Sequence, residues 1–215
     1  TSLPTLTGTA IMLDVGANVD CSAQHLAQFA IMGNEYGKHL FGKPNPRIGL
    51  LSIGEEDIKG SEVTKEAFKL LKASSLNFIG NIEGRDVYSG SADVVVCDGF
   101  IGNVALKISE GVADTIKKLL IKEISGSFLG RLAYPLIAKP LLNLKKKIDY
   151  AEFGGAPLLG VNGITMICHG RSSAKAIKNA IRRAKGLAES RVDELIQRDI
   201  EESALQAKPA EDMPS

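Results

Sequence analysis

Short apolar segments alternate with helical patterns along this chain, and the alternation constrains the fold more than any other feature. The segments at 10–18, 47–54, 77–84, 92–99 and 163–170 have the length and apolar character of buried strands. Helical patterns occupy 22–41, 61–74, a long stretch after residue 102, and 172–202. Buried strands separated by helices are typical of parallel sheets covered on both faces. The sequence therefore predicts an α/β fold with a mostly parallel, doubly wound sheet.

Polar and glycine-rich residues follow every one of these strands. They occupy 14–18, 54–56, 81–86, 98–103 and 169–172. In open parallel sheets, ligands bind in the crevice at the carboxyl ends of the strands. We therefore expect the five strand ends to form one candidate site.

The stretch "VVVCDGFIGNVALK", residues 94–107, runs from a strand through a turn into a helix. Gly99 and Gly102 would let the backbone approach a ligand closely. Free amides and a partial positive charge at the helix start suit phosphate. The spacing matches neither a P-loop nor a dinucleotide fingerprint. The alternative is that Asp98 and Asn103 only cap the helix.

A second strand end, "CHGRSS" at 168–173, repeats the arrangement. His169 ends the strand, Arg171 could add charge, and the next two serines could bind phosphate with the backbone amides. Capping by Ser172 or Ser173 is the favoured reading of the serines, and a lone histidine often has no role. No acid is clearly placed to complete a serine–histidine triad.

Metal, nucleic-acid and disulfide roles have little support. Cys21 and His25 stand four apart on a helix, but no further ligands converge, and capping by Asp20 or Ser22 is the simpler account. The net charge is +1, which argues against a nucleic-acid partner. The three cysteines lack paired spacing, and the first residues lack the pattern of a signal peptide, so we expect a reducing cytoplasm.

Residues 116–150 predict an amphipathic helical hairpin that is interrupted by two prolines. Its apolar positions include Phe128, Leu129, Leu132, Leu136 and Ile137, flanked by cations such as Lys145 and Lys146. A basic amphipathic stretch can lie on an anionic membrane surface. A dimer interface or a core helix pair would give the same pattern. Beyond it, residues 204–215 read as a disordered tail.

Six segments in this order and spacing resemble the PlsX-type phosphate acyltransferases, over about residues 13–184. They are "LDVGANVDC", "FAIMGNEYGK", "PRIGLLSIGEEDIKG", "NFIGNIEGRD", "ADVVVCDGFIGNVALKISEG" and "YAEFGGAPLLGVNGITMICHGRSSAKAIKNAI". The resemblance implies a fold like that of isocitrate dehydrogenase and phosphotransacetylase. It also implies transfer of a long-chain fatty acyl group from acyl carrier protein to inorganic phosphate, giving acyl phosphate for phospholipid synthesis.

The resemblance further implies a homodimer in the cytoplasm, peripherally associated with the inner face of the membrane, with no metal or organic cofactor. Our own hypothesis, which the resemblance does not supply, is that bound phosphate attacks the thioester directly, with Asp98, His169 and Asn103 as candidate catalytic residues. The candidates for substrate binding are Asp14, Asn18, Lys59, Asn81, Glu83, Arg85, Gly99, Gly102, Asn162, Gly170 and Ser172.

Two features depart from the family pattern. The family's chains begin with further strand–helix units that include an Asp-x-Met-Gly-Gly-Asp stretch, and these precede the part that residue 1 matches. Residues 1–203 are therefore expected to form a partial domain. Arg171 replaces a small residue. The alternatives are a short-chain phosphotransacylase that uses coenzyme A, and an inactive fragment that retains dimer or membrane binding.

Overall fold

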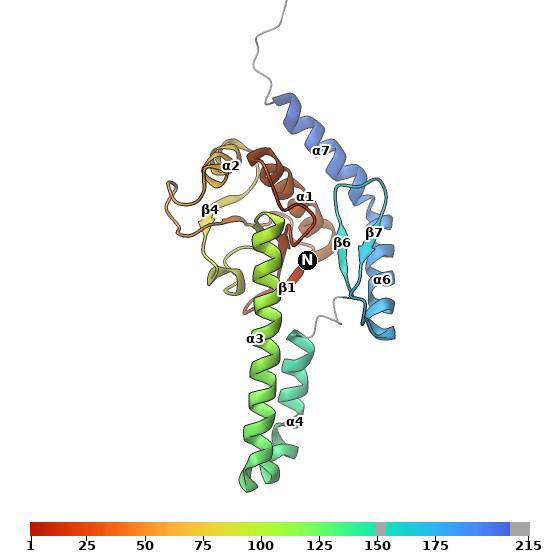
Figure 1. The fold of residues 1–215 in the computed structure, drawn as a ribbon. Helices are drawn as coiled ribbons and strands as arrows, with labels where there is room; N and C mark the ends of the chain where they lie inside the picture. The colour runs from red at the N-terminus through yellow and green to blue at the C-terminus, as the bar shows by residue number, and fades with distance from the viewer. Residues whose placement is uncertain (149–153, 207–215) are drawn as a thin grey trace, which may run out of the picture.

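The computed structural model of the chain describes residues 1–148 and 154–206, and its centre is a five-stranded sheet (Figure 1). The strands are β1 (Ser2–Thr5), β2 (Gly8–Leu13), β3 (Ile48–Leu51), β4 (Phe78–Ile82) and β5 (Val94–Val96). Their order across the sheet is β1-β2-β5-β3-β4, with β1 antiparallel to β2 and the other pairs parallel. The predicted α/β class and mostly parallel sheet are confirmed. The short edge strand β1 is additional to the predicted strands.

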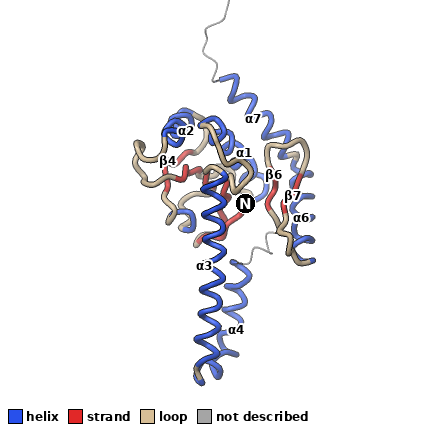
Figure 2. Tube along the Cα trace, in the orientation of Figure 1, coloured by secondary structure: helices blue, strands red, loops and turns tan. Residues whose placement is uncertain are grey.

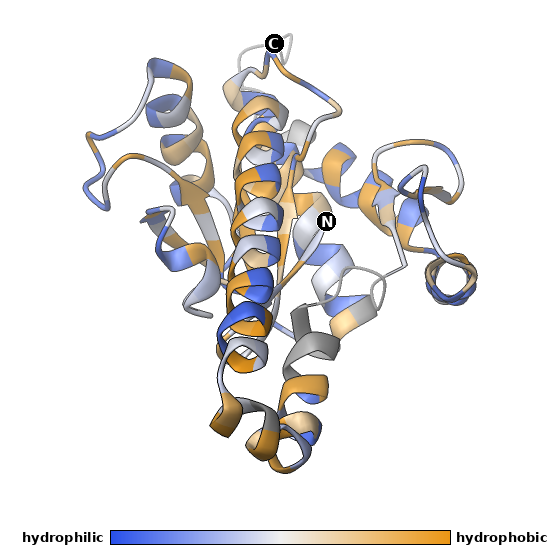
Figure 3. Cartoon of the chain, turned by 60° about the horizontal axis from the view of Figure 1, so that its bottom comes forward, coloured by the Kyte–Doolittle hydropathy of each residue, from blue (hydrophilic) through white to orange (hydrophobic). Residues whose placement is uncertain are grey.

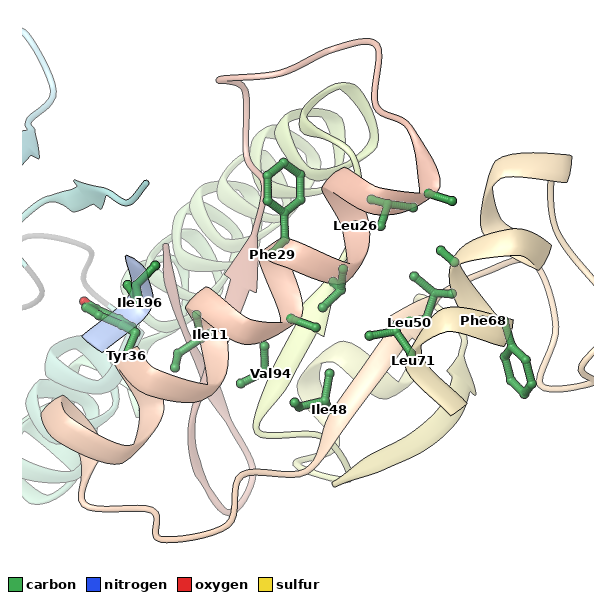
Figure 4. Packing of buried hydrophobic residues seen from close by; sticks show 14 of the residues in the cluster. Ile11, Leu26, Phe29, Tyr36, Ile48, Leu50, Phe68, Leu71, Val94 and Ile196 are labelled. Atoms are coloured by element: carbon green, nitrogen blue, oxygen red, sulfur yellow. The ribbon is translucent and has the colours of Figure 1, made fainter. Parts of the chain in front are cut away.

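One face of the sheet is covered by α1 (Ala23–Phe41) and α2 (Glu62–Ala73). Figure 4 shows their side chains packed on the sheet residues Ile11, Ile48 and Val94. Both helices begin at a serine cap, because the hydroxyls of Ser22 at α1 and Ser61 at α2 accept first-turn amides.

The opposite face is covered by the first turns of α3 (Gly99–Gly126) and by the short 3₁₀ helix η1 (Asp86–Tyr88). Met12 and Val95 of the sheet pack there with Val87, against half-buried Ala105 and Leu106 of α3. Helical elements therefore lie on both faces of the sheet (Figure 2).

The prediction that residues 163–170 form a strand of the main sheet is wrong. Within this stretch β7 (Thr165–Ile167) pairs antiparallel with β6 (Ala156–Leu158) in a separate two-stranded sheet beside α6 (Ala174–Ser190) (Figure 1). Both ends of β7 are exposed, so its apolar run does not mark a fully buried strand. An apolar run alone does not specify its pairing partner.

The predicted helix over 172–202 is divided into α6 and α7 (Val192–Gln206). Arg191 separates them in the left-handed conformation, with φ 52°. Val192 and Ile196 of α7 are buried in the same core as α1. Residues 204–206, the start of the predicted tail, belong to α7, and residues 207–215 lie outside the described part.

The far half of α3 and the helix α4 (Phe128–Ile148) form an arm that extends away from the sheet (Figures 1 and 2). Ser127 joins them in an extended conformation. Pro135 and Pro140 lie inside α4, so the interruption falls at Ser127 instead of at the prolines. Figure 3 shows hydrophobic residues along α3 and along the coloured part of α4. Within residues 1–148 and 154–206, no helix combines the length and apolarity needed to cross a bilayer.

Candidate functional site

The candidate site lies at the carboxyl ends of the four parallel strands. Because β2, β5, β3 and β4 are neighbours in that order, the segments that follow them meet at one edge of the sheet. These segments are 14–22, the start of α3, 52–61 and 83–86. Four of the five predicted strand ends are thus brought together. The fifth, around His169, belongs to the separate β6–β7 sheet.

Asp14 holds the loop after β2 in shape. Its carboxylate accepts hydrogen bonds from the amides of Gly16, Ala17 and Asn18 at 2.7–3.0 Å, and from the Asn18 side chain at 3.0 Å. Burial alone would raise the pKa of this carboxyl, but the four hydrogen bonds outweigh it and the pKa is lowered. Asp14 is therefore an ionised organiser of the loop, with both oxygens engaged by the loop itself.

The start of α3 is capped by Asp98, whose Oδ1 accepts the amide of Ile101 at 2.8 Å. The amide of Gly99 donates to the Asn18 carbonyl at 2.8 Å, and that of Gly102 donates to the Asp98 carbonyl at 3.0 Å. We expected the amide of Gly102 to be available for phosphate, and this expectation is wrong. The amides of Gly99, Ile101 and Gly102 already donate to the Asn18 carbonyl and to Asp98.

Close packing explains why both residues of this turn, Gly99 and Gly102, are glycines. A Cβ at Gly99 would lie 2.6 Å from the carbonyl oxygen of Asn18, and one at Gly102 only 1.8 Å from that of Asp14. The close approach predicted for a ligand is thus made by the backbone of loop 14–18, which lies directly against the helix start.

Asn103 is the polar side chain that α3 presents beside this loop. It is exposed, and its Cγ lies 3.6 Å from the Cβ position at Gly16. Cys97, directly after β5, is buried and donates to the Asp14 carbonyl at 3.3 Å. Burial raises the pKa of this thiol to about 12, so it is protonated at neutral pH and acts as a packing residue.

The ends of β3 and β4 contain two buried polar atoms that have no hydrogen-bond partner among the described residues. They are the Ser52 Oγ and the Asn81 Oδ1. The Asn81 Nδ2 donates to the Glu56 carbonyl at 2.9 Å, which fixes the amide with its oxygen directed elsewhere. Unsatisfied buried polar atoms are rare and often mark a binding site. The sequence predicted Asn81 but missed Ser52, although a serine directly after "GLL" was the available signal.

The cationic candidates Lys59 and Arg85 lie on the loops beside this point. The stem of Lys59 folds over Gly54, with its Cγ 3.1 Å from the Cβ position there. Arg85 is exposed and forms ion pairs with Glu55 at 3.1 Å and Glu83 at 3.2 Å. An anion at this edge would therefore compete with two carboxylates for the guanidinium.

The remaining candidates lie on the β6–β7 unit. His169 accepts the amide of Arg171 on its Nδ1 at 3.1 Å, and its carbonyl accepts the amide of Ser172 at 2.9 Å. Ser173 caps α6, which confirms one of the two predicted capping residues. Asn162 and Gly170 are exposed in the loops on either side of β7.

Cys21 and His25 do not gather further ligands in the described residues. The Nδ1 of His25 accepts the amide of Ser22, and the Ser22 hydroxyl accepts the amide of His25, which is a capping box. The thiol of Cys21 donates to the Asn18 carbonyl at 3.3 Å. Across residues 1–148 and 154–206, no three His, Cys, Asp or Glu side chains are grouped as metal ligands would be.

The predicted membrane residues lie on α4. Leu136, Phe128, Leu129 and Leu132 are 68–82% exposed, and Ile137 is 37% exposed. The side chains of Lys145 and Lys146 lie outside the described part of the chain, although their backbone belongs to the end of α4.

The fold and this edge define an α/β protein with a polar site at the carboxyl end of a mostly parallel sheet. The family model described as "Fatty acid synthesis protein" matches residues 1–195, and the chain belongs to this family.

Similar curated proteins carry the name phosphate acyltransferase. The one from Thermodesulfovibrio yellowstonii is 57% identical over 192 residues, which are 89% of this chain and 56% of that protein. The one from Trichlorobacter lovleyi is 54% identical over 93% of this chain and 58% of its own length. The one from Geobacter sulfurreducens is 58% identical over 83% of this chain and 51% of its own length. The chain thus spans a little over half the length of these relatives.

Proposed function

We propose that this chain forms part of a phosphate acyltransferase, which transfers a long-chain fatty acyl group from acyl carrier protein to inorganic phosphate. The observation that carries the proposal is the identity of 54–58% to proteins of that name over most of the chain. The exposed apolar arm favours a long-chain substrate made near a membrane over a short-chain thioester of coenzyme A.

In the proposed reaction, a phosphate oxygen attacks the thioester carbonyl carbon. A carbon–oxygen bond forms, the carbon–sulfur bond breaks, and the departing sulfur takes a proton to leave as a thiol. We place the phosphate between the start of α3 and the ends of β3 and β4. There Lys59 and Arg85 supply positive charge, Ser52 can donate its hydroxyl proton, and Asn103 can donate to the developing oxyanion.

Proton transfer is assigned to Asp98 or His169. Asp98 lies at the edge itself, and its Oδ1 is engaged by the helix cap. His169 lies on the separate β6–β7 sheet, so a role for it requires that unit to contribute to the same crevice. Replacement of each residue by its amide or uncharged counterpart, Asp98→Asn or His169→Gln, distinguishes the two assignments by loss of turnover.

The partners follow from the arm. A stripe on α3 comprises Ile101, Val104, Ile108, Val112, Ile116 and Leu119, which are 42–61% exposed. Spacings of three and four residues put these side chains on one face of the helix, as in a seam between two helices. We assign this face to a homodimer contact. We assign the exposed apolar residues of α4 to peripheral contact with an anionic membrane at its cytoplasmic side.

The test is phosphate-dependent release of carrier-protein thiol from palmitoyl-acyl carrier protein. The chain is assayed alone and after fusion to the N-terminal segment of a relative, with Arg85→Ala as the site variant and Arg198→Ala as the matched surface control. The expected result is turnover in at least one form, lowered by Arg85→Ala and unchanged by Arg198→Ala. The absence of phosphate-dependent release in both forms would contradict the proposed function.

A further inference from the structure

Helix α6 has a pronounced one-sided charge. No acidic residue lies between Gly154 and Ala188, although the whole chain contains 25 acidic and 26 basic residues. The same stretch carries six cations, which are Arg171, Lys175, Lys178, Arg182, Arg183 and Lys185. A segment this unbalanced in a chain of net charge +1 concentrates positive charge in one part of the molecule.

Four of these cations form a row on α6. Lys175, Lys178, Arg182 and Lys185 are separated by three, four and three residues, which places them along one face of a helix. All four are exposed. At 100° per residue, this cationic row lies opposite the buried residues of α6, which are Ala176, Ala180 and Leu187.

An apolar row runs beside the cationic row. Ile177 and Ile181 stand one turn apart and are 40% and 66% exposed. A face that combines a line of cations with an exposed apolar row matches a partner that presents carboxylates around an apolar contact.

Within the cationic row, Arg182 and Lys185 make only weak contacts. The Arg182 Nη1 lies 3.4 Å from the Asn179 Oδ1, and the Lys185 Nζ lies 3.6 Å from a carboxylate oxygen of Glu189 in a pair that is 73% and 66% exposed. Exposed pairs of this kind contribute little free energy in water, so they hold the cations only loosely. The charges of Arg182 and Lys185 are therefore available to an incoming partner.

Arg183, in contrast, anchors α6 to the body of the protein. Its Nη1 donates to the Ser2 Oγ at 3.1 Å and to the Tyr36 hydroxyl at 3.3 Å, and its guanidinium lies 5.7 Å from the centre of the Phe41 ring. The helix is thereby fixed with its buried face inward and its cationic row outward. A helix held in one orientation presents its row of charges to a partner from a constant direction.

We infer that the cationic row of α6 is the docking surface for an acidic helical protein, the carrier protein that delivers the acyl group. This inference rests on the proposed function, which requires a protein-bound acyl donor. The attraction between the two surfaces would speed the encounter and weaken as salt is added, because the screening length falls from about 10 Å at 0.1 M to about 3 Å at 1 M.

The test measures binding without chemistry. Labelled apo-acyl carrier protein, which holds no thioester, is titrated with the chain by fluorescence anisotropy at low and high salt. The double variant Lys178→Glu, Arg182→Glu is expected to bind at least ~10-fold more weakly at low salt, because it converts two attractions into repulsions. The charge-preserving variant Lys178→Arg, Arg182→Lys is expected to stay within about 2-fold of the unaltered chain.

Two controls separate the possible outcomes. Lys69→Glu changes one exposed charge on α2 and is expected to leave binding unchanged, and circular dichroism checks that every variant is folded. Anisotropy unaffected by the double reversal would overturn the inference, as would binding of phosphatidylglycerol vesicles through the cationic row without binding of carrier protein. Binding that depends on the cationic row, without turnover, would support this inference and contradict the proposed function. Turnover that the row variants leave unchanged would support the proposed function and contradict this inference.

Discussion

Gly102 is the residue at which the packing of the candidate site is tightest. A methyl group there would lie 1.8 Å from the Asp14 carbonyl oxygen and 2.9 Å from the Cys97 Sγ, and the nearer atom belongs to backbone that cannot rotate away. We expect Gly102→Ala to lower the free energy of unfolding by about 3 kcal/mol, the upper part of the usual range for overpacking. Urea unfolding followed by circular dichroism measures it.

Gly111 offers a control for Gly102 on the same helix. A methyl group added at Gly111 would have no neighbouring atom within 4 Å outside its own helix backbone. Alanine there is expected to raise the free energy of unfolding by up to ~1 kcal/mol through helix propensity alone. Equal stability of the Gly102→Ala and Gly111→Ala variants would show that loop 14–18 does not lie against the start of α3.

Asp93 gives the fold a dependence on pH. Burial opposes its charge, but hydrogen bonds from Arg47 and Lys43 outweigh this and lower the pKa to about 2 from its ordinary value of 3.8. Since the folded pKa is the lower one, the unfolded chain binds the proton first as pH falls. The stabilisation, about 2 kcal/mol, is complete above about pH 5 and disappears as pH falls towards 2.

The prediction for Asp93 is read from unfolding free energies between pH 5 and 2.5. Asp93→Asn is expected to be less stable than the unaltered chain at pH 5 and to lose less stability on acidification. Asp57 serves as the control, because its pair with Lys72 is 60% and 65% exposed and screened by water. A pH profile that Asp93→Asn leaves unchanged would refute the account.

At the scale of elements, the sequence predicted what local chemistry determines. The caps Ser22 of α1 and Ser173 of α6 follow from the local sequence, and the structure confirms them. The sequence did not predict which strands pair with one another. An apolar run at 163–170 has the same pattern in the main sheet or in a separate hairpin, and only tertiary packing selects between them.

The candidate site was predictable to a similar extent. The parallel order of β2, β5, β3 and β4 brings their ends together, as the alternation of strands and helices indicated. The roles of Asp14 and Gly102 were not predictable, because both depend on a contact between two backbone segments that are far apart in the sequence. Ser52 is recognised only once its hydroxyl is known to be buried.

The arm provides a prediction for α4. Leu132 and Leu136 are 68% and 82% exposed, and a glutamate at either position would repel an anionic surface and remove apolar area from it. We expect Leu132→Glu, Leu136→Glu to reduce co-sedimentation with phosphatidylglycerol vesicles at least ~10-fold. Leu6→Glu changes an equally exposed leucine, 89% accessible, in the turn between β1 and β2. If both variants lost binding alike, α4 would not be the membrane contact.

At the scale of the whole molecule, three surfaces are separated in space. The polar edge of the sheet lies between its covering helices, the apolar arm extends away from it, and the basic helix α6 lies beside the β6–β7 sheet (Figure 1). An enzyme that takes an acyl group from a soluble carrier and releases a lipid-like product needs three such surfaces. The proposals for the edge, the arm and α6 therefore belong to one cycle, although each is tested by its own measurement.

The apolar stripe of α3 gives the prediction that concerns the assembly. Val112 and Ile116 lie near its middle and are both 52% exposed, so a charge at each is tolerated by a monomer but not inside a seam between two copies. Sedimentation velocity is expected to show a dimer for the unaltered chain and a monomer for Val112→Glu, Ile116→Glu, with unchanged helix content. Lys117→Glu, Lys118→Glu adds the same number of acids at exposed positions between Ile116 and Leu119 that do not belong to the stripe, and this variant is expected to remain dimeric. If the unaltered chain is a monomer, or if the stripe variant remains a dimer, the stripe must belong to some other contact. The reason is that an apolar stripe of this length is unfavourable in water unless another surface covers it.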